Sequence, residues 1–450
     1  MAEATSNEQT QHAFQAEVSR VLSLVINSLY SNKEVFLREL VSNAADALDK
    51  LRFKALTDKS LLQGDTELKV RIIPDKEAGT LTIWDNGIGM TEAELVENLG
   101  TVAHSGSAAF LEQLAERKGD VELIGQFGVG FYSAYLVADE VEVISLAAGE
   151  TKAVRWASKG QDGFVTGPAE RETRGTSIVL HLKESHREYL ELWTLRSLVS
   201  RYSDFVSYPI ELPTFTAAGD EDEEKAEEAP AFEQVNQASA LWRRPESEVS
   251  EEQYKEFYSH ISHDWEAPLT RTHFTIEGTQ QFTGLLYIPS RPPFDLFASG
   301  QSRGLRLHVK RVFVMDECED LLPPWLRFLR GVVDSDDLPL NVSRETLQDS
   351  RVIKVIRKQV VKKALDMIEA LAVDNPDGFE TFWTHFGAVL KEGFHYDPEH
   401  KNRLAKLLRF KTSKGEGLVS LDQYVNRMPV AQPAIYFVQG LNAERLAKSP

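Results

Sequence analysis

Residues 36–53 read Phe36-Leu-Arg-Glu-Leu-Val-Ser-Asn-Ala-Ala-Asp-Ala-Leu-Asp-Lys-Leu-Arg-Phe53, and the rest of the chain can be interpreted around this stretch. Good helix formers fill it and neither Gly nor Pro interrupts it, so it predicts an α-helix. Polar side chains recur along one face of that helix: Glu39, Asn43, Asp46 and Lys50. A stripe of this kind is also typical of plain solvated surface. Two glycine-rich stretches further along the chain favour a functional role.

The composition limits the class of protein. The chain has 450 residues, 42% hydrophobic and 26% charged, with a formal net charge of -19. The length suggests about three domains, and the negative charge argues against an extended nucleic-acid surface, which needs clustered Lys and Arg. Cys318 is the only cysteine, so no disulfide can form within the chain. The N-terminus lacks a signal-peptide pattern and no stretch suits a membrane span, so we expect a cytoplasmic protein without nucleic-acid or membrane partners.

The first half of the chain alternates helical patterns with β-rich runs. Helices are expected at 13–30, 36–53, 91–99 and 189–202, and strands at 68–73, 80–84, 141–146, 153–157 and 176–182. The two runs at 68–73 and 80–84 are expected to form a hairpin. This order predicts an α+β fold in which helices flank a mostly antiparallel sheet.

A run of acidic residues divides the chain. Asp220-Glu-Asp-Glu-Glu-Lys-Ala-Glu-Glu228 cannot bury enough apolar area to order itself, which predicts a linker. We therefore expect a first domain at 1–215, a linker at 216–231 and a second, α/β domain at 232–450. Its strands are expected at 272–277, 282–288 and 305–314, its helices at 352–372, 379–390, 402–410 and 421–427, and a short βα segment at 434–447.

The first glycine-rich stretch, Asp85-Asn-Gly-Ile-Gly-Met90, closes a predicted strand. A carboxylate there can accept a hydrogen bond from the exocyclic amine of adenine, and Gly87 and Gly89 let a flat ring approach the backbone. The same residues also suit a simple turn at the end of a strand.

The second glycine-rich stretch, Gly125-Gln-Phe-Gly-Val-Gly-Phe131, runs into a predicted helix. Its backbone N–H groups could bind phosphates, or the glycines could serve only close packing. Arg174-Gly175-Thr176, entering a strand, adds a further element. The fixed order of these elements indicates an ATP site, and the chain lacks the Gly-x-x-x-x-Gly-Lys-Ser/Thr pattern of a P-loop.

Phosphoryl transfer gives each polar side chain a role. The amide oxygen of Asn43 suits Mg²⁺, and Glu39, one turn away, can deprotonate a water that attacks the γ-phosphate. Lys50 can pair with phosphate or be a solvated helix charge. Arg344 is the candidate cation for the developing γ-phosphate charge, although it equally suits a salt bridge at the start of a helix.

These motifs resemble the GHKL (Bergerat-type) ATPase superfamily of gyrase, histidine kinases and mismatch-repair MutL. Ser28–Leu40, Gly125–Ser133 and Leu338–Asp349 narrow the resemblance to the ninety-kilodalton heat-shock chaperones, in particular their bacterial members, from about Phe14 to the end. The resemblance implies an ATP-driven, homodimeric stress-response chaperone of unfolded client proteins. It also implies a Bergerat-type α/β sandwich followed by a middle domain with a helical end.

The resemblance also assigns residues. Glu39 matches the catalytic glutamate, Asn43 the Mg²⁺ ligand, Asp85 the adenine-binding aspartate and Arg344 an arginine that reaches the γ-phosphate. The remaining matches are nucleotide-pocket positions: Asp46, Lys50, Gly89, Met90, Asn98, Gly125, Gln126, Phe127, Gly128, Val129, Gly130, Phe131, Thr176, Asn341 and Gln348.

Residues 98–125 match the family's lid over ATP, in which His104 stands where the family usually has Lys. The sequence ends at Pro450, near the end of the family's middle domain, so we expect the C-terminal dimerisation domain to be absent.

Other functions stay open from the sequence. They are a DNA-acting ATPase of the same superfamily, a sensor kinase, and a nucleotide-sensing scaffold that does not hydrolyse ATP. Trp325 and Phe328 lie in an apolar, Pro-broken segment that suits either a client-binding patch or a core-packed loop.

Overall fold

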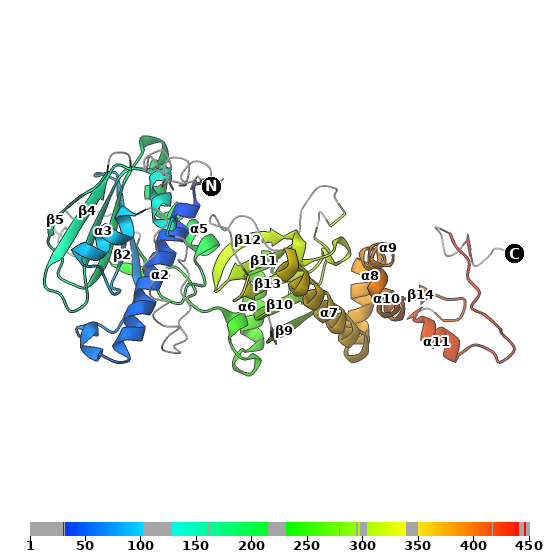
Figure 1. Ribbon diagram of the computed structural model, residues 1–450. Helices are drawn as coiled ribbons and strands as arrows, with labels where there is room; N and C mark the ends of the chain where they lie inside the picture. The colour runs from blue at the N-terminus through cyan, green and yellow to red at the C-terminus, as the bar shows by residue number, and fades with distance from the viewer. Residues whose placement is uncertain are drawn as a thin grey trace, which may run out of the picture. The chain divides into compact units, whose positions relative to one another are not determined.

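The computed structural model describes residues 30, 32–101, 128–160, 163–214, 231–278, 280–293, 296–297, 304–338, 350–415, 417–440 and 445–446. Along the chain, the two compact units divide between Ala240 and Leu241. Figure 1 shows the helices and strands of both units. The helix expected at 13–30, apart from Tyr30, and the acidic run lie outside the described residues. Within those described ranges, no helix is both long enough and apolar enough to cross a membrane.

The first unit is built on one eight-stranded sheet with the order β5-β4-β3-β6-β2-β1-β7-β8. Its strands are β1 (Val70–Asp75), β2 (Thr80–Asp85), β3 (Ala138–Leu146), β4 (Ala153–Ser158), β5 (Val165–Ala169), β6 (Gly175–Leu182), β7 (Ile210–Pro213) and β8 (Phe232–Gln234). Every neighbouring pair is antiparallel except β1 and β7. The predicted hairpin of β1 and β2 and the mostly antiparallel sheet are confirmed.

Helices flank this sheet, as the α+β prediction required. They are α2 (Val35–Ala55), α3 (Glu92–Gly100) and α5 (Leu192–Tyr202), with shorter 3₁₀ segments η1 (Lys59–Leu62), η2 (Gly130–Leu136) and η3 (Glu184–Leu190). The α2 helix packs against β1, β2, α5 and η2. Its apolar face, which includes Leu37, Leu40 and Leu48, is buried, and this burial holds the helix against the sheet.

The helix expected after the second glycine-rich stretch forms as a 3₁₀ helix, η2. Another helical prediction needs correction. The single helix expected at 189–202 is divided into η3 and α5, because Glu191 takes an extended conformation between them.

The first sheet continues beyond the acidic run. Phe232–Gln234 forms β8, which pairs antiparallel with β7. Asn236 then accepts a hydrogen bond from the Ile210 N–H (2.9 Å) and donates to the carbonyls of Val206 (3.2 Å) and Tyr208 (3.0 Å). These bonds keep residues 232–236 with the first unit, whereas the sequence placed the start of the second domain at residue 232.

The second unit has a five-stranded sheet with the order β12-β11-β13-β10-β9. Its strands are β9 (Thr270–Ile276), β10 (Phe282–Ile288), β11 (Leu305–Val309), β12 (Val312–Cys318) and β13 (Arg330–Ser335). The single strand expected at 305–314 is wrong, because Lys310 and Arg311 both take positive φ and turn the chain into a hairpin. Glycine, asparagine and aspartate usually mark such turns, and none of them is present here.

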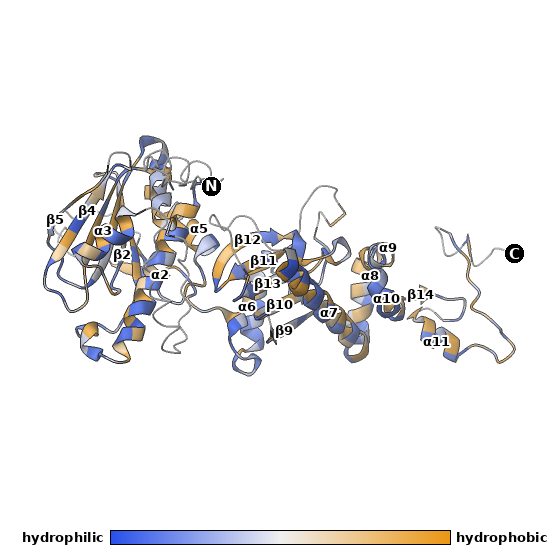
Figure 2. Cartoon of the chain, viewed as in Figure 1, coloured by the Kyte–Doolittle hydropathy of each residue, from blue (hydrophilic) through white to orange (hydrophobic). Residues whose placement is uncertain are grey.

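Helices cover the second sheet and extend the unit. They are α6 (Glu251–Ser262), α7 (Ser350–Asp374), α8 (Pro376–Lys391), α9 (Gly393–Tyr396), α10 (Lys401–Leu407) and α11 (Leu421–Asn426), with β14 (Phe410–Lys411) and β15 (Leu418–Val419) as a small second sheet. Both α7 and α8 carry hydrophobic and hydrophilic residues, as expected of helices with one buried side (Figure 2). The strand expected within 434–447 does not form among the described residues of this range, 434–440 and 445–446.

Trp325 and Phe328 belong to the core of the second unit. Both side chains are fully buried. Phe328 stacks on Phe386 of α8 at a ring-centroid distance of 4.9 Å, and Trp325 lies under Gly393 at the start of α9. The structure therefore contradicts their assignment to an exposed client-binding patch and supports the alternative, a core-packed loop.

Candidate functional site

Asp85 ends β2 with a buried carboxylate. Its Oδ1 accepts hydrogen bonds from the backbone N–H of Gly87 (2.8 Å) and of Thr176 (3.3 Å). Burial raises the pKa of Asp85 to about 6, although these N–H groups and the charge of Arg171 oppose the shift. Both described hydrogen bonds engage one oxygen, so the carboxylate is fixed in orientation while its Oδ2 can serve a ligand.

The turn after Asp85 is fixed between the helix α2 and the strand β3. The Ile88 N–H donates to the carbonyl of Ala47 on α2 (3.1 Å). A Cβ on Gly89, which has φ 64°, would come within 2.0 Å of the Leu146 carbonyl oxygen. This close approach requires glycine, so the second glycine of the turn serves packing against β3.

A pair of buried hydroxyls supports the same turn from neighbouring strands. Ser145 Oγ lies 3.0 Å from Thr176 Oγ1 and accepts a hydrogen bond from the Met90 N–H (2.8 Å). Thr176 faces Asp85 across the β2–β6 pairing. The structure thus brings together Asp85, Gly89, Met90 and Thr176, as the sequence predicted.

Glu39 occupies a buried position on α2 next to the second glycine-rich stretch. The Arg38 guanidinium donates to Glu39 Oε1 through Nε (3.1 Å) and Nη2 (2.9 Å). A Cβ on Gly130 would lie 2.7 Å from Glu39 Oε2. One carboxylate oxygen is therefore held by Arg38, and the other faces the glycine-rich segment.

The other polar residues of α2 differ in exposure. Asp46 is buried, whereas Asn43 and Lys50 are half-buried. Burial lowers the pKa of the Lys50 ammonium, and the charge of Asp46 opposes this effect. This face of α2 is therefore not the plain solvated surface that the stripe alone would also have allowed.

The segment that follows Gly130 is joined to the end of α3. The Tyr132 hydroxyl donates to the carbonyl of Leu99 (3.0 Å), next to half-buried Asn98. Val129 and Phe131 are buried, and Gly128 takes a φ of 65°. The segment η2 is thus packed against α2, and Tyr132 joins it to the end of α3.

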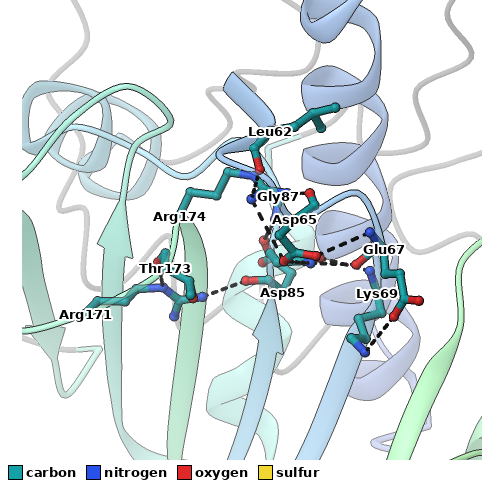
Figure 3. A network of polar contacts seen from close by, with 10 residues as sticks. Leu62, Asp65, Glu67, Lys69, Asp85, Gly87, Arg171, Thr173 and Arg174 are labelled. Carbon is teal, nitrogen blue, oxygen red and sulfur yellow. Dashed lines mark hydrogen bonds and ion pairs between the residues drawn. The ribbon is translucent and has the colours of Figure 1, made fainter. Parts of the chain in front are cut away.

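Two arginines that precede β6 contact different segments: Arg174 reaches Leu62 and Asp65, and Arg171 reaches Asp85 (Figure 3). Arg174 is buried and donates to the carbonyls of Leu62 and Asp65, both at 2.7 Å. Arg171 donates to the backbone carbonyl of Asp85 at 2.6 Å. Arg174 therefore fixes the loop before β1, whereas Arg171 contacts the site itself.

Several predicted site residues lie outside the described residues: Gly125, Gln126, Phe127, Asn341, Arg344 and Gln348. The same holds for His104 and most of the predicted lid. Their roles stay predictions.

Sequence patterns missed three residues that contact the site: Arg38, Ser145 and Arg171. Arg38 precedes Glu39 directly, and neighbouring helix residues do not share a face, so helical spacing gave no signal. Ser145 and Arg171 reach the site through strand pairing and a loop between strands. Only the fold could reveal them.

Comparison with known proteins agrees with this geometry. Residues 216–450 match the family described as Hsp90 protein, and residues 30–169 match the family described as histidine kinase-, DNA gyrase B-, and HSP90-like ATPase. A relative named Chaperone protein HtpG from Myxococcus xanthus (strain DK1622) is 59% identical over 446 residues, which cover 98% of this chain and 68% of the relative. Another protein of that name, from Halorhodospira halophila (strain DSM 244 / SL1), is 52% identical over 440 residues, or 96% and 70% of the two chains. The predicted resemblance is confirmed, and the topoisomerase, mismatch-repair and sensor-kinase alternatives are not favoured.

Proposed function

This chain belongs to the Hsp90 family and is an ATP-dependent molecular chaperone with ATPase activity. On that premise we propose separate roles for two carboxylates of its first unit. Asp85 selects adenine, and Glu39 acts in hydrolysis. The observation that carries the proposal is the approach of Gly130 to Glu39 Oε2, because it brings a glycine-rich segment against a carboxylate able to act as a base.

Adenine recognition follows from the environment of Asp85. A buried carboxylate needs hydrogen-bond donors, and two backbone N–H groups already bind its Oδ1. The exocyclic amine of adenine supplies a donor for Oδ2. Gly87 lies against Ala47 of α2, where a Cβ would come within 2.8 Å of the Ala47 carbonyl carbon, so the turn that carries Asp85 is held in place for the ring.

Hydrolysis requires a base beside the γ-phosphate. Glu39 Oε2 takes the proton of the attacking water, while Arg38 holds the opposite oxygen and fixes the carboxylate plane. Because Glu39 is buried beside the described glycines, bulk water has little access to its carboxylate. Such a base contributes about 10²- to 10⁴-fold to the rate of a proton-transfer step.

Magnesium fits the donor that α2 offers one turn beyond Glu39. Mg²⁺ prefers oxygen ligands and keeps several waters, and Asn43 presents an amide oxygen at a half-buried position rather than within the apolar core. Asn43 would hold the ion that arrives with the triphosphate. The ion would neutralise phosphate charge.

Further parts of the proposal rest on the resemblance. Arg344 stabilises the developing charge on the γ-phosphate, and residues 98–125 close over ATP. The protein works in the cytoplasm as a homodimer. As an Hsp90-family chaperone it binds client proteins.

The test compares two substitutions of Glu39. Glu39→Gln keeps an oxygen that can accept from Arg38 but cannot take a proton, and Glu39→Ala removes both functions. Both variants should bind ATP within about threefold of wild type and lose hydrolysis by about 10²-fold or more. Calorimetric titration and single-turnover hydrolysis on the same samples measure the two quantities. Wild-type turnover in Glu39→Gln would refute the role of Glu39 as the base.

A further inference from the structure

Arg171 lies on the short connection between β5 and β6 and directs its guanidinium at the end of β2 (Figure 3). Its Nη2 donates to the backbone carbonyl of Asp85 (2.6 Å), and its Nε donates to the carbonyl of Thr173 (2.9 Å). Its Nη1 donates to the Ser177 hydroxyl. The same guanidinium lies 5.5 Å from the centre of the Trp84 ring. Arg171 thus joins three segments at the residue assigned to adenine.

The three hydrogen bonds hold the guanidinium in one place. Ser177 faces Trp84 in the β2–β6 pairing, and Thr176 faces Asp85, so Arg171 spans two successive rungs of the sheet. A planar guanidinium with several fixed donors suits this task better than an ammonium group would. Its hydrogen bond is to the backbone of Asp85 rather than to the carboxylate, which leaves the carboxylate oxygens to the N–H groups and the ligand.

Arg171 is also a charge close to a buried acid. Its guanidinium is largely desolvated, which lowers the pKa of Arg171, and the charge of Asp85 counters that effect. In return, the positive charge of Arg171 opposes the rise in the pKa of Asp85 that burial causes. The contact therefore acts on the protonation of Asp85 as well as on its position.

The other charged groups around this turn are arranged in opposite-sign pairs. On α2, Lys50 and Asp46 interact with each other. On the loop before β1, Arg174 lies 3.9 Å from Asp65, whose carboxylate also accepts from Asn86 at 2.8 Å. The described hydrogen bonds of Arg171, in contrast, go to two carbonyls and a hydroxyl. Among these charged groups, Arg171 is therefore the one whose positive charge acts on the Asp85 carboxylate.

We propose that Arg171 is a positioning residue for adenine recognition, which fixes the end of β2 and keeps the Asp85 carboxylate in the ionised form that accepts from the exocyclic amine of adenine. The inference rests on the proposed role of Asp85. Arg171 does not contact the nucleotide in this account and acts only through Asp85.

The test is the pH dependence of ADP binding by the full chain. Titrations at about pH 6, 7 and 8.5 compare wild type with Arg171→Gln and Arg171→Lys. Arg155→Gln is the matched control, because Arg155 lies on β4 of the same sheet and pairs with Glu142 at 2.6 Å, away from Asp85. The phosphates of ADP titrate in this range too, so the informative quantity is the ratio of variant to wild-type Kd at each pH.

Arg171→Gln should weaken ADP binding about tenfold near pH 6–7, because loss of the charge leaves more of Asp85 protonated. At pH 8.5, where Asp85 is ionised in both proteins, the Kd of Arg171→Gln should be at most about twice that of wild type. Arg171→Lys keeps the charge but not the fixed donors, so it should restore part of the affinity at the lower pH. Arg155→Gln should give a ratio near one throughout. A weakening of equal size at every pH, no weakening at all, or a Lys variant that behaves as the Gln variant would overturn the proposal.

Asp85→Asn separates this inference from the proposed function. If Asp85→Asn binds ADP as wild type does, the adenine role of Asp85 is wrong and the inference about Arg171 falls with it. If Asp85→Asn loses binding while Arg171→Gln shows no pH-dependent change, only the inference about Arg171 fails. Should Arg171→Gln not fold, Arg171→Lys at the three pH values decides, since a ratio above about fivefold throughout would contradict rescue by a retained charge.

Discussion

Replacement of Asp85 by asparagine should abolish ADP binding and at the same time stabilise the nucleotide-free protein. Binding is lost because the side-chain amide nitrogen of asparagine replaces Oδ2. Its N–H groups then face the exocyclic amine of adenine, which is also a hydrogen-bond donor. The amide oxygen retains the two hydrogen bonds from the N–H groups of Gly87 and Thr176. The variant therefore loses its function without losing the local contacts of the turn.

The gain in stability follows from the sign of the pKa shift. Burial raises the pKa of Asp85 from its ordinary value of 3.8 to about 6. The folded protein then holds this proton more tightly than the unfolded chain does, so stability is lost as the pH rises between these values. A shift of about two units corresponds to about 3 kcal/mol at neutral pH. Asparagine does not ionise, so the free energy of unfolding of the variant does not fall in this way as the pH rises.

The difference between variant and wild type should depend on pH. We expect about 3 kcal/mol near pH 7.5 and about 1 kcal/mol near pH 4.5. For a unit of this size, 3 kcal/mol corresponds to an increase in Tm of about 6–12 °C. Urea unfolding and thermal melts of the nucleotide-free proteins, followed by circular dichroism, measure the two quantities.

Asp139→Asn serves as the control, because Asp139 is exposed on β3 of the same sheet. It should change the free energy of unfolding by less than about 0.5 kcal/mol at either pH. A variant at position 85 that is less stable than wild type near pH 7.5, or a stability gain of the same size at both pH values, would refute the reasoning.

Three further predictions concern other residues. Gly130→Ala should slow ATP hydrolysis by about tenfold or more with a smaller effect on ADP affinity, since the new Cβ displaces Glu39 Oε2; unchanged hydrolysis would argue against the base assignment. Arg344→Ala should leave ADP affinity unchanged and slow hydrolysis by up to about 10³-fold, and single-turnover rates at wild-type level would exclude the role. Phe328→Ala should destabilise the second unit by about 3–5 kcal/mol, because Phe328 is fully buried; a melt unchanged from wild type, alongside reduced client binding, would restore its client-binding role.

The sequence predicted the parts of the fold that local patterns encode. The amphipathic α2, the β1–β2 hairpin and the α7 and α8 helices all form near the predicted residues. The patterns failed where pairing between distant segments decides the structure. The turn at Lys310 and Arg311 carries no turn residue, and β8 is only three residues long and forms because β7 offers it an edge.

The candidate site shows the same division. Asp85 and Glu39 could be found because a glycine turn and a helical stripe mark them in the sequence. Arg38, Ser145 and Arg171 support those carboxylates from a neighbouring position, another strand and a loop, which no spacing rule connects. Trp325 and Phe328 show the opposite error, since apolar residues broken by prolines suit a surface patch and a core equally until burial is known.

The β8 strand has a practical consequence for dissecting the protein. A fragment that stops at residue 215 would remove β8 and Asn236, leaving β7 as a bare edge with its backbone groups open to other chains. Exposed edges of this kind template aggregation. A fragment carried on to residue 238, which also keeps the hydrogen bond from the Gln237 N–H to Asp204, should remain monodisperse where the shorter one precipitates.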